Sequence, residues 1–310
     1  MIKLSNGCRV WYVIASGALG FDGKGWFWER PLVRLGLIEL DLFTVVLKTL
    51  TLNPRRGNLQ MRNPLTWLPC SPWGCVKFIP GGVVNKVGLS NKGFYWWCKK
   101  IAPKINFDKR SIVVSIWGAR DECVEMAREL NRFNLTAIEW NDSCPNTGHA
   151  LTGVEASIET AKAIKAVSRH PIIAKVSVDQ DYLAIARELV GVVEAFDFNS
   201  VKMETVFPEM KKGPLWRLER RVGGGGGGVS GEPAQIHNWR AVEALAKQGL
   251  IPVIAPSIME YGDMCFVRRL GARAVSFGAI HLASHSIWLK PWTIFTNPCK
   301  PTSFVRRENS

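Results

Sequence analysis

The sequence lacks the marks of a membrane or secreted protein. No run of roughly 18 uncharged apolar residues occurs, so a membrane-spanning helix is not expected. The first nine residues, MIKLSNGCR, contain no apolar signal-peptide core. We therefore expect a cytoplasmic protein without membrane insertion, whose eight cysteines are mostly reduced.

Groups that bind metals are also scarce. The chain has only five histidines, and Cys70 and Cys75 are too widely spaced for a usual zinc knuckle, with no second pair after them. No four-cysteine iron–sulfur spacing is present either. The sequence therefore predicts no metal site.

Acidic residues are outnumbered, with 26 Asp and Glu against 40 Lys and Arg, which gives a formal charge of +14. The basic residues are scattered, and no nucleic-acid motif accompanies them. We interpret the charge as a solvated basic surface and expect no nucleic-acid partner. An anionic substrate and a phosphate-bearing cofactor would also suit a positive protein.

The apolar pattern predicts about eight strands with amphipathic helices between them. The strands are expected at residues 10–15, 43–47, 112–116, 136–140, 172–176, 195–198, 252–254 and 274–277. The helices are expected at residues 121–132, 153–168, 180–190, 236–248 and 261–270. This alternation in 310 residues predicts one (β/α)8 barrel of the TIM type. A doubly wound fold is disfavoured, because the turn after the first strand (ASGALG) lacks the Gly-x-Gly-x-x-Gly pattern.

Two stretches interrupt the repeat. Residues 50–92 are rich in proline and predict an inserted loop, with a small hairpin, over the active site. Residues 203–231 form a second insertion that holds six consecutive glycines, Gly223 to Gly228. The glycines suit either a flexible hinge or a backbone that approaches a ligand. We expect one barrel domain over residues 1–290 and a polar tail over residues 291–310.

Polar residues follow the predicted strands at their C-terminal ends, where βα barrels carry their active sites. Two lysines, Lys48 and Lys175, end strands two and five, and amides end strands four and six. A single lysine at a strand edge is usually a surface residue. A whole series at one end of the barrel is hard to assign to core packing, so we predict a site for an anionic, amide-rich planar molecule.

The segment 138–146 (IEWNDSCPN) places a thiol, Cys144, between Asn141 and Asn146 on a loop that leaves a strand. By itself this pattern also suits a turn with a buried free cysteine. No carboxylate pair, histidine cluster or Ser/His/Asp arrangement lies at the strand ends, which disfavours hydrolysis and metal chemistry. Cys144 could act as a nucleophile or as a base. A thiolate needs electropositive surroundings at neutral pH, and the sequence leaves open whether Lys48 or Lys175 provides them.

Taken together, these motifs resemble the dihydroorotate dehydrogenases, FMN-dependent βα-barrel enzymes of pyrimidine synthesis. The resemblance covers roughly residues 15–283. Its marks are the segments 15–17 (ASG), 48–58 (KTLTLNPRRGN), 85–89 (NKVGL), 141–146 (NDSCPN), 175–176 (KV), 199–200 (NS) and 227–231 (GGVSG). They are specific in combination and weak singly.

The resemblance implies a role for each matching residue. Cys144 matches the cysteine base of the class 1 enzymes. The implied substrate-binding residues are Lys48, Asn85, Val87, Gly88, Leu89, Asn141, Asn146, Asn199 and Ser200. The implied FMN-binding residues are Ala15, Ser16, Gly17, Lys48, Thr49, Asn141, Lys175, Gly227, Gly228, Ser257, Ile258, Gly278 and Ala279. The implied reaction is proton removal from C5 of dihydroorotate by Cys144 and hydride transfer from C6 to N5 of FMN.

The chain departs from the family where the flavin phosphate would bind. That segment is usually glycine-rich, but here it is Ala255-Pro256-Ser257-Ile258, and Pro256 has no N–H to donate. Two alternatives stay open for this reason. One is a diverged flavoenzyme acting on another dihydropyrimidine or enone, and the other is a flavin-free barrel serving as a binding or structural subunit.

The resemblance leaves the electron acceptor open between fumarate, a quinone and NAD reached through a partner. The chain has no long apolar N-terminal extension of the kind that serves quinone in class 2 enzymes. We therefore expect a soluble acceptor or an electron-transfer partner subunit. A homodimer is consistent with the class 1 relatives.

Overall fold

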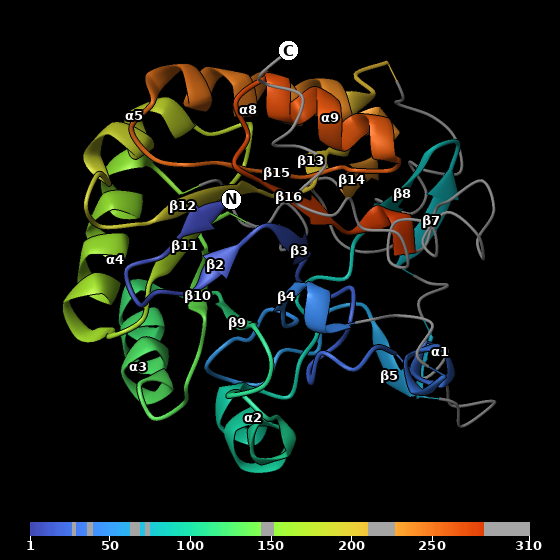
Figure 1. The fold of residues 1–310 in the computed structure, drawn as a ribbon. Helices are drawn as coiled ribbons and strands as arrows, with labels where there is room; N and C mark the ends of the chain where they lie inside the picture. The colour runs from blue at the N-terminus through green and yellow to red at the C-terminus, as the bar shows by residue number, and fades with distance from the viewer. Residues whose placement is uncertain are drawn as a thin grey trace.

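The computed structural model describes residues 1–26, 29–35, 40–62, 69–71, 75–143, 152–209 and 227–281. Its main sheet has eight parallel strands that neighbour one another in chain order (Figure 1). They are β3 (Tyr12–Ile14), β4 (Thr44–Val46), β9 (Ile112–Ile116), β10 (Ala137–Asn141), β11 (Ile172–Val176), β12 (Ala195–Phe198), β15 (Ile254–Ala255) and β16 (Ala274–Phe277).

The sheet closes on itself. Phe196 of β12 forms a parallel bridge with Val253, and its N–H donates to the Pro252 carbonyl at 3.0 Å. At the other side of β15, β16 returns to pair with β3. The (β/α)8 barrel predicted from the sequence is therefore confirmed. The seventh strand lies slightly later than predicted, at Ile254–Ala255 rather than at residues 252–254.

Helices surround the barrel (Figure 1). They are α1 (Arg30–Arg34), α2 (Phe94–Lys100), α3 (Arg120–Leu130), α4 (Val154–Val167), α5 (Tyr182–Glu188), α6 (Met203–Val206), α8 (Glu232–Gln248) and α9 (Tyr261–Arg269), with short 3-10 turns at Leu40–Leu42, Ala102–Lys104 and Ala279–His281. All five predicted helices are present with shifts of a few residues at their ends. Helix α2 was missed because its run of aromatic residues, FYWWCKK, gives no clear amphipathic period.

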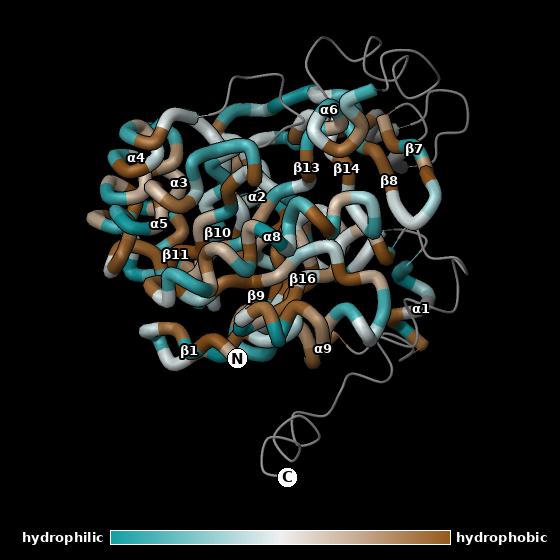
Figure 2. The backbone as a smooth tube through the Cα atoms, turned by 90° about the horizontal axis from the view of Figure 1, so that it is seen from above, coloured by the Kyte–Doolittle hydropathy of each residue, from teal (hydrophilic) through white to brown (hydrophobic). Residues whose placement is uncertain are grey.

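The barrel strands bury both faces, and alternate residues belong to different layers. The outward residues, such as Trp140 and Phe277, pack against the helices. The inward residues at the bottom form one apolar layer with a residue from each strand: Val13, Val46, Val113, Ala137, Ile173, Ala195, Ile254 and Ala274. The hairpin of β1 (Ile2–Lys3) and β2 (Arg9–Val10) caps this layer with Ile2, Leu4 and Val10. Figure 2 shows the resulting hydrophobic stretches along β9 and β16 inside the molecule.

Two residues further along, the inward positions become polar on six of the eight strands, β3 and β15 being the exceptions. Val46 is followed by Lys48, Val113 by Ser115, Ala137 by Glu139, Ile173 by Lys175, Ala195 by Asp197 and Ala274 by Ser276. Because the side-chain period of a strand is two, these residues occupy the next interior layer toward the C-terminal end. The interior of the barrel is therefore apolar below and charged above.

A second sheet covers this end of the barrel. It is antiparallel, in the order β13 (Val201–Lys202), β14 (Gly228–Gly231), β8 (Gly82–Asn85) and β7 (Val76–Ile79). The two predicted insertions thus meet, since β7 and β8 come from one and β14 from the other. A further hairpin, β5 (Gln60–Arg62) with β6 (Pro69–Ser71), belongs to the first insertion.

Glycine is required where the two insertions touch. Gly231 has φ +99°, and a Cβ there would lie 2.5 Å from the Gly81 carbonyl oxygen. Of the glycine run, residues 223–226 lie outside the described residues, while Gly228 is part of β14. The predicted tail, residues 291–310, also lies outside them, so the domain limits stay a prediction. None of the helices within the described ranges is long and apolar enough to cross a bilayer.

Trp97 of α2 is the clearest test of this packing. It is fully buried, stacks on Phe94 and donates its indole N–H to the Phe21 carbonyl at 2.9 Å. We expect Trp97→Ala to lower the free energy of unfolding by about 3–5 kcal/mol, because it leaves a large cavity. Tyr95→Ala on the same helix, where the side chain is half exposed, should cost about 1 kcal/mol or less. Urea denaturation of both variants checks this, and equal losses would contradict the assignment.

Candidate functional site

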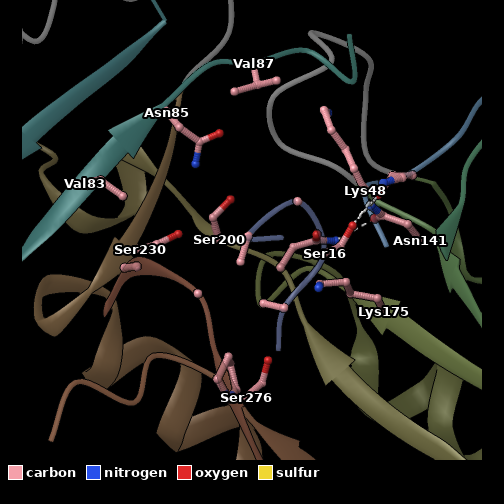
Figure 3. A pocket seen from close by; sticks show the side chains of 18 of the residues that line it. Ser16, Lys48, Val83, Asn85, Val87, Asn141, Lys175, Ser200, Ser230 and Ser276 are labelled. Carbon is pink, nitrogen blue, oxygen red and sulfur yellow. Dashed lines mark hydrogen bonds between the residues drawn. The ribbon is translucent and has the colours of Figure 1, made fainter. Parts of the chain in front are cut away.

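A cavity of about 250 Å³ lies between the C-terminal ends of the barrel strands and the second sheet. It gathers most of the residues that the sequence assigned to substrate or cofactor: Ala15, Ser16, Gly17, Lys48, Thr49, Asn85, Val87, Gly88, Leu89, Asn141, Lys175, Asn199, Ser200, Ser257, Gly278 and Ala279. Figure 3 shows Ser16, Lys48, Asn141 and Lys175 grouped together, with Ser230 and Ser276 at another part of the wall.

Two predicted site residues, Cys144 and Asn146, lie outside the described residues, so their place stays a prediction. Three described ones, Gly227, Gly228 and Ile258, do not line this cavity. Ile258 is fully buried and belongs to the main hydrophobic core. Gly228 pairs with Asn85 in the second sheet, and the last two residues of β14, Ser230 and Gly231, line the cavity instead.

A chain of hydroxyls and amides crosses the floor of the cavity. The Ser16 hydroxyl is 2.9 Å from the Thr49 hydroxyl, which is 2.9 Å from that of Ser115. The Asn141 amide approaches Thr49 Oγ1 at 3.4 Å, and Asn199 Nδ2 donates to Asn141 Oδ1 at 3.0 Å. Five barrel strands thus fix one another's polar ends, and such connected networks are rigid.

Asn199 also reaches the segment that carries the predicted base. Its Nδ2 donates to the Ser143 carbonyl, so the last described residue before Cys144 is tied to the cavity floor. Neighbouring Asp142 is buried and accepts hydrogen bonds from Ser157 Oγ at 2.6 Å and Gln180 Nε2 at 2.7 Å. Burial raises the pKa of the Asp142 carboxyl, against the lowering effect of these donors.

Lys48 and Lys175 bring positive charge to the same cavity. Lys48 is 6 % exposed, and its ammonium lies 5.7 Å from the centre of the Phe21 ring. Lys175 Nζ lies 3.3 Å from Glu139 Oε2 and 3.5 Å from Asp197 Oδ2. Burial alone would favour the neutral amine, but the two carboxylates outweigh it and raise the pKa of Lys175. Lys175 is therefore a permanent cation in the cavity wall.

The segment after β15 is held by side chains of helix α8. Gln235 Nε2 donates to the Ser257 carbonyl at 3.0 Å, and Asn238 Nδ2 donates to Ser257 Oγ at 3.0 Å. Trp239 Nε1 donates to the Pro256 carbonyl at 2.9 Å. These contacts hold Ser257 at φ +65°, a left-handed conformation that usually favours glycine. Side-chain contacts thus hold this segment, which departs from the glycine-rich turn usual in the family that the sequence resembles.

Three polar residues at this end were missed from the sequence. Ser276 lines the cavity, and the two-residue period that leads to Gly278 could have identified it. Ser230 belongs to β14, whose pairing with β8 joins segments about 150 residues apart. Asn238 lies on helix α8, and nothing in the local sequence indicates that it faces the cavity.

The cavity wall contains buried polar atoms that have no hydrogen-bond partner among the described residues. Ser276 Oγ and Asn238 Oδ1 are buried, line the cavity and have no hydrogen-bond partner within the described part of the chain. Buried polar groups are normally paired, so unpaired ones at a cavity wall indicate groups that a ligand satisfies. The backbone at Gly278 lies close to Ala15 on the neighbouring strand end, because a Cβ added at Gly278 would be 3.3 Å from the Ala15 Cβ.

These features define a βα barrel whose C-terminal end carries a cavity lined by cations, amides and hydroxyls, a lining that suits a polar, anionic ligand. The profile of the family described as dihydroorotate dehydrogenase matches residues 31–280 of the chain. The chain belongs to the dihydroorotate dehydrogenase family, and it is therefore an oxidoreductase that depends on a flavin. The two lysines, the unpaired Ser276 hydroxyl and the unpaired Asn238 amide oxygen of the cavity fit such a group.

Among known proteins, three similar ones are each named as the catalytic subunit of dihydroorotate dehydrogenase B (NAD(+)). The Bacteroides thetaiotaomicron protein is 29% identical over 286 residues, covering 89% of this chain and 85% of its own. The Endomicrobium trichonymphae protein is 30% identical over 291 residues, with 91% and 85% covered. The Brachyspira hyodysenteriae protein is 31% identical over 276 residues, with 86% and 80% covered.

A solved structure shares the fold. The crystal structure of the Amycolatopsis orientalis BexX/CysO complex contains a chain that aligns with a TM-score of 0.50 and 15% identity. The alignment covers 95% of this chain and 91% of that one. At this identity the likeness concerns the fold alone.

The unpaired Ser276 hydroxyl gives a prediction for the flavin-free protein. A buried hydroxyl without a partner costs roughly 1–3 kcal/mol, so Ser276→Ala should leave the free energy of unfolding unchanged or raise it by up to about 1 kcal/mol. Ser115→Ala, which removes one of the hydrogen-bond partners of Thr49, should lower it by about 1 kcal/mol. Urea denaturation measures both, and a similar loss in the two variants would show that Ser276 is satisfied within the protein.

Proposed function

We propose that this chain oxidises dihydroorotate to orotate in pyrimidine biosynthesis and that its flavin is FMN. The observation that carries the proposal is the convergence of Asn85, Asn141 and Asn199 with two lysines on one cavity, in a chain of this family. When bound, the flavin supplies the hydride acceptor. The chain's own residues bind, orient and deprotonate the substrate.

The three asparagines suit the imide edge of a pyrimidine ring, because a carboxamide both donates and accepts hydrogen bonds. Asn141 and Asn199 are already bonded to each other, which fixes the direction of their amides before a ligand arrives. The ammonium of Lys48 in the same wall suits an anionic ring substituent such as a carboxylate. We assign Asn146, Val87, Gly88, Leu89 and Ser200 to the same substrate site.

Cys144 is the proposed base that takes the proton from C5. The Asn199 hydrogen bond to the Ser143 carbonyl brings the start of its loop to the cavity floor, next to the amides that would hold the ring. A thiol is a useful base only where positive charge favours the thiolate. Lys48 supports this role as a cation in the same cavity.

The phosphate of FMN is proposed to lie near the loops after β15 and β16. Phosphate sites in such barrels commonly form from the loops after strands seven and eight. In this chain Ser257, Ser276 and Asn238 bring polar side chains to that part of the wall. The Ser257 and Ser276 hydroxyls supply donors in place of the missing glycine-rich turn, together with backbone at Gly278 and Ala279. Asn238 holds Ser257 in position through its hydrogen bond to Ser257 Oγ.

We further propose that electrons leave through a partner subunit. The relatives are named as catalytic subunits of an NAD(+) enzyme, which supports NAD reached through a partner as the acceptor. A homodimer and a cytoplasmic location, both expected from the sequence, belong to the same proposal.

The first test is anaerobic reduction of the bound flavin by dihydroorotate. The loss of the flavin's visible absorbance measures the reduction. Cys144→Ala should abolish the reduction while the flavin stays bound, because the base is missing. Cys144→Ser is the matched control. Its flavin should be reduced slowly at neutral pH and faster at high pH, since a hydroxyl is a much weaker acid than a thiol and is ionised to a far smaller extent.

Each other outcome has a clear meaning. A colourless protein that takes up no FMN would contradict the enzyme proposal. Bound flavin that another dihydropyrimidine reduces, but dihydroorotate does not, would indicate a diverged substrate. Unchanged reduction in Cys144→Ala would remove Cys144 from the mechanism.

The second test concerns the phosphate. Ser276→Ala should raise the dissociation constant for FMN by roughly 10–100-fold, because its unpaired hydroxyl can donate to the phosphate and a hydrogen bond to a charged group contributes about 1.5–3 kcal/mol. Riboflavin, which lacks the phosphate, is the control ligand, and its dissociation constant should stay within about threefold of its original value. Flavin fluorescence titration of the flavin-free protein measures both, and equal weakening of the two ligands would place the phosphate elsewhere.

A further inference from the structure

The cluster of Glu139, Lys175 and Asp197 lies directly beneath the cavity. Neighbouring strands β10, β11 and β12 supply one residue each, and Lys175 is paired in register with Asp197. The carboxylate side chains are each 1 % exposed and the lysine side chain 8 %. Only Lys175 belongs to the cavity wall. The two carboxylates therefore act on a ligand in the cavity through their electrostatic effect on Lys175.

The cluster does not balance its charge. One ammonium faces two carboxylates, so with all three ionised the cluster carries one excess negative charge. Asp197 Oδ1 accepts the Phe198 N–H at 2.8 Å, while Glu139 Oε1 has no partner within the described ranges. A buried net charge is costly and is relieved when one group takes up a proton.

Asp197 is the group that would take this proton. Burial raises the pKa of its carboxyl to about 6, with Glu139 adding to the rise and Lys175 opposing it. On its other side, β15 brings Ile254 and Ala255, which do not titrate. Below about pH 6, where Asp197 is protonated, the net charge of the cluster is zero. At higher pH, where Asp197 is ionised, the net charge is −1.

We propose that Asp197 is a positioning residue for Lys175 and that its protonation links the reduction potential of the bound flavin to pH. Reduction adds negative charge beside Lys175, which increases the proton affinity of Asp197. The carboxylate then binds one proton from solvent and becomes a carboxylic acid, with no bond to the substrate made or broken. This inference rests on the flavin site of the proposed function.

The test is a titration of the flavin midpoint potential between pH 5 and 8 by electrochemical reduction, which needs no substrate. Asp197→Asn keeps the shape and removes the charge. We expect its potential to equal that of the unaltered protein near pH 5 and to be more positive at pH 8. The difference between the two proteins cancels the flavin's own ionisation, and a constant or zero difference would overturn the proposal.

Glu139→Gln is the matched control, because it removes the other carboxylate from the same lysine. It should also move the potential in the positive direction, but Asp197 stays able to titrate. Since Glu139 contributes to the raised pKa of Asp197, the pH-dependent step should move to lower pH. A step at the original pH would contradict the coupling.

A measurement on the unaltered protein tests the proposal even if the variants do not fold. The infrared difference spectrum between the reduced and oxidised protein above pH 6 should show a new C=O band of a protonated carboxyl group, and its absence would overturn the proposal. Failure of the proposed substrate is distinguishable, because dihydroorotate would then not reduce the flavin while the potential still followed pH. A protein that binds no flavin would end both.

Discussion

The two-residue alternation of side chains along strands that close into a barrel is the constraint on which the structure depends. It assigns one residue per strand to a bottom layer, including Val113 and Ile173, and the next inward residue to the layer above. There the same strands carry Ser115 and Lys175. The apolar layer supplies the burial that holds the barrel together, and the polar layer can be charged because that stability is provided below it.

Placing charge in this layer has a physical cost that the neighbouring strands offset. A lone lysine at this depth would lose its proton, but Lys175 lies within 3.5 Å of carboxylates on both adjacent strands. Parallel register makes this arrangement, because it brings Asp197 directly opposite the lysine. The cation at the cavity wall is thus a property of three strands.

Much of the fold followed from local pattern. Strands β9, β11, β12 and β16 have the limits predicted from their apolar runs, which long, continuous hydrophobic segments make reliable. The lysines and asparagines at the strand ends were recognised because the barrel topology places all such ends together. The seventh strand was misplaced, since it is only two residues long and its neighbour Val253 joins β12 through one bridge.

By itself, the sequence determined the order of strands and helices, the family and the residues at each strand end, because these depend on local periodicity and motif. The closure of the site needed tertiary structure. Asn238 reaches Ser257 from another helix, β14 pairs with β8 across about 150 residues, and Asp197 acquires its meaning from its contact with Lys175. Such contacts join distant segments, and a charge or hydroxyl changes its chemistry only when burial and neighbours are fixed together.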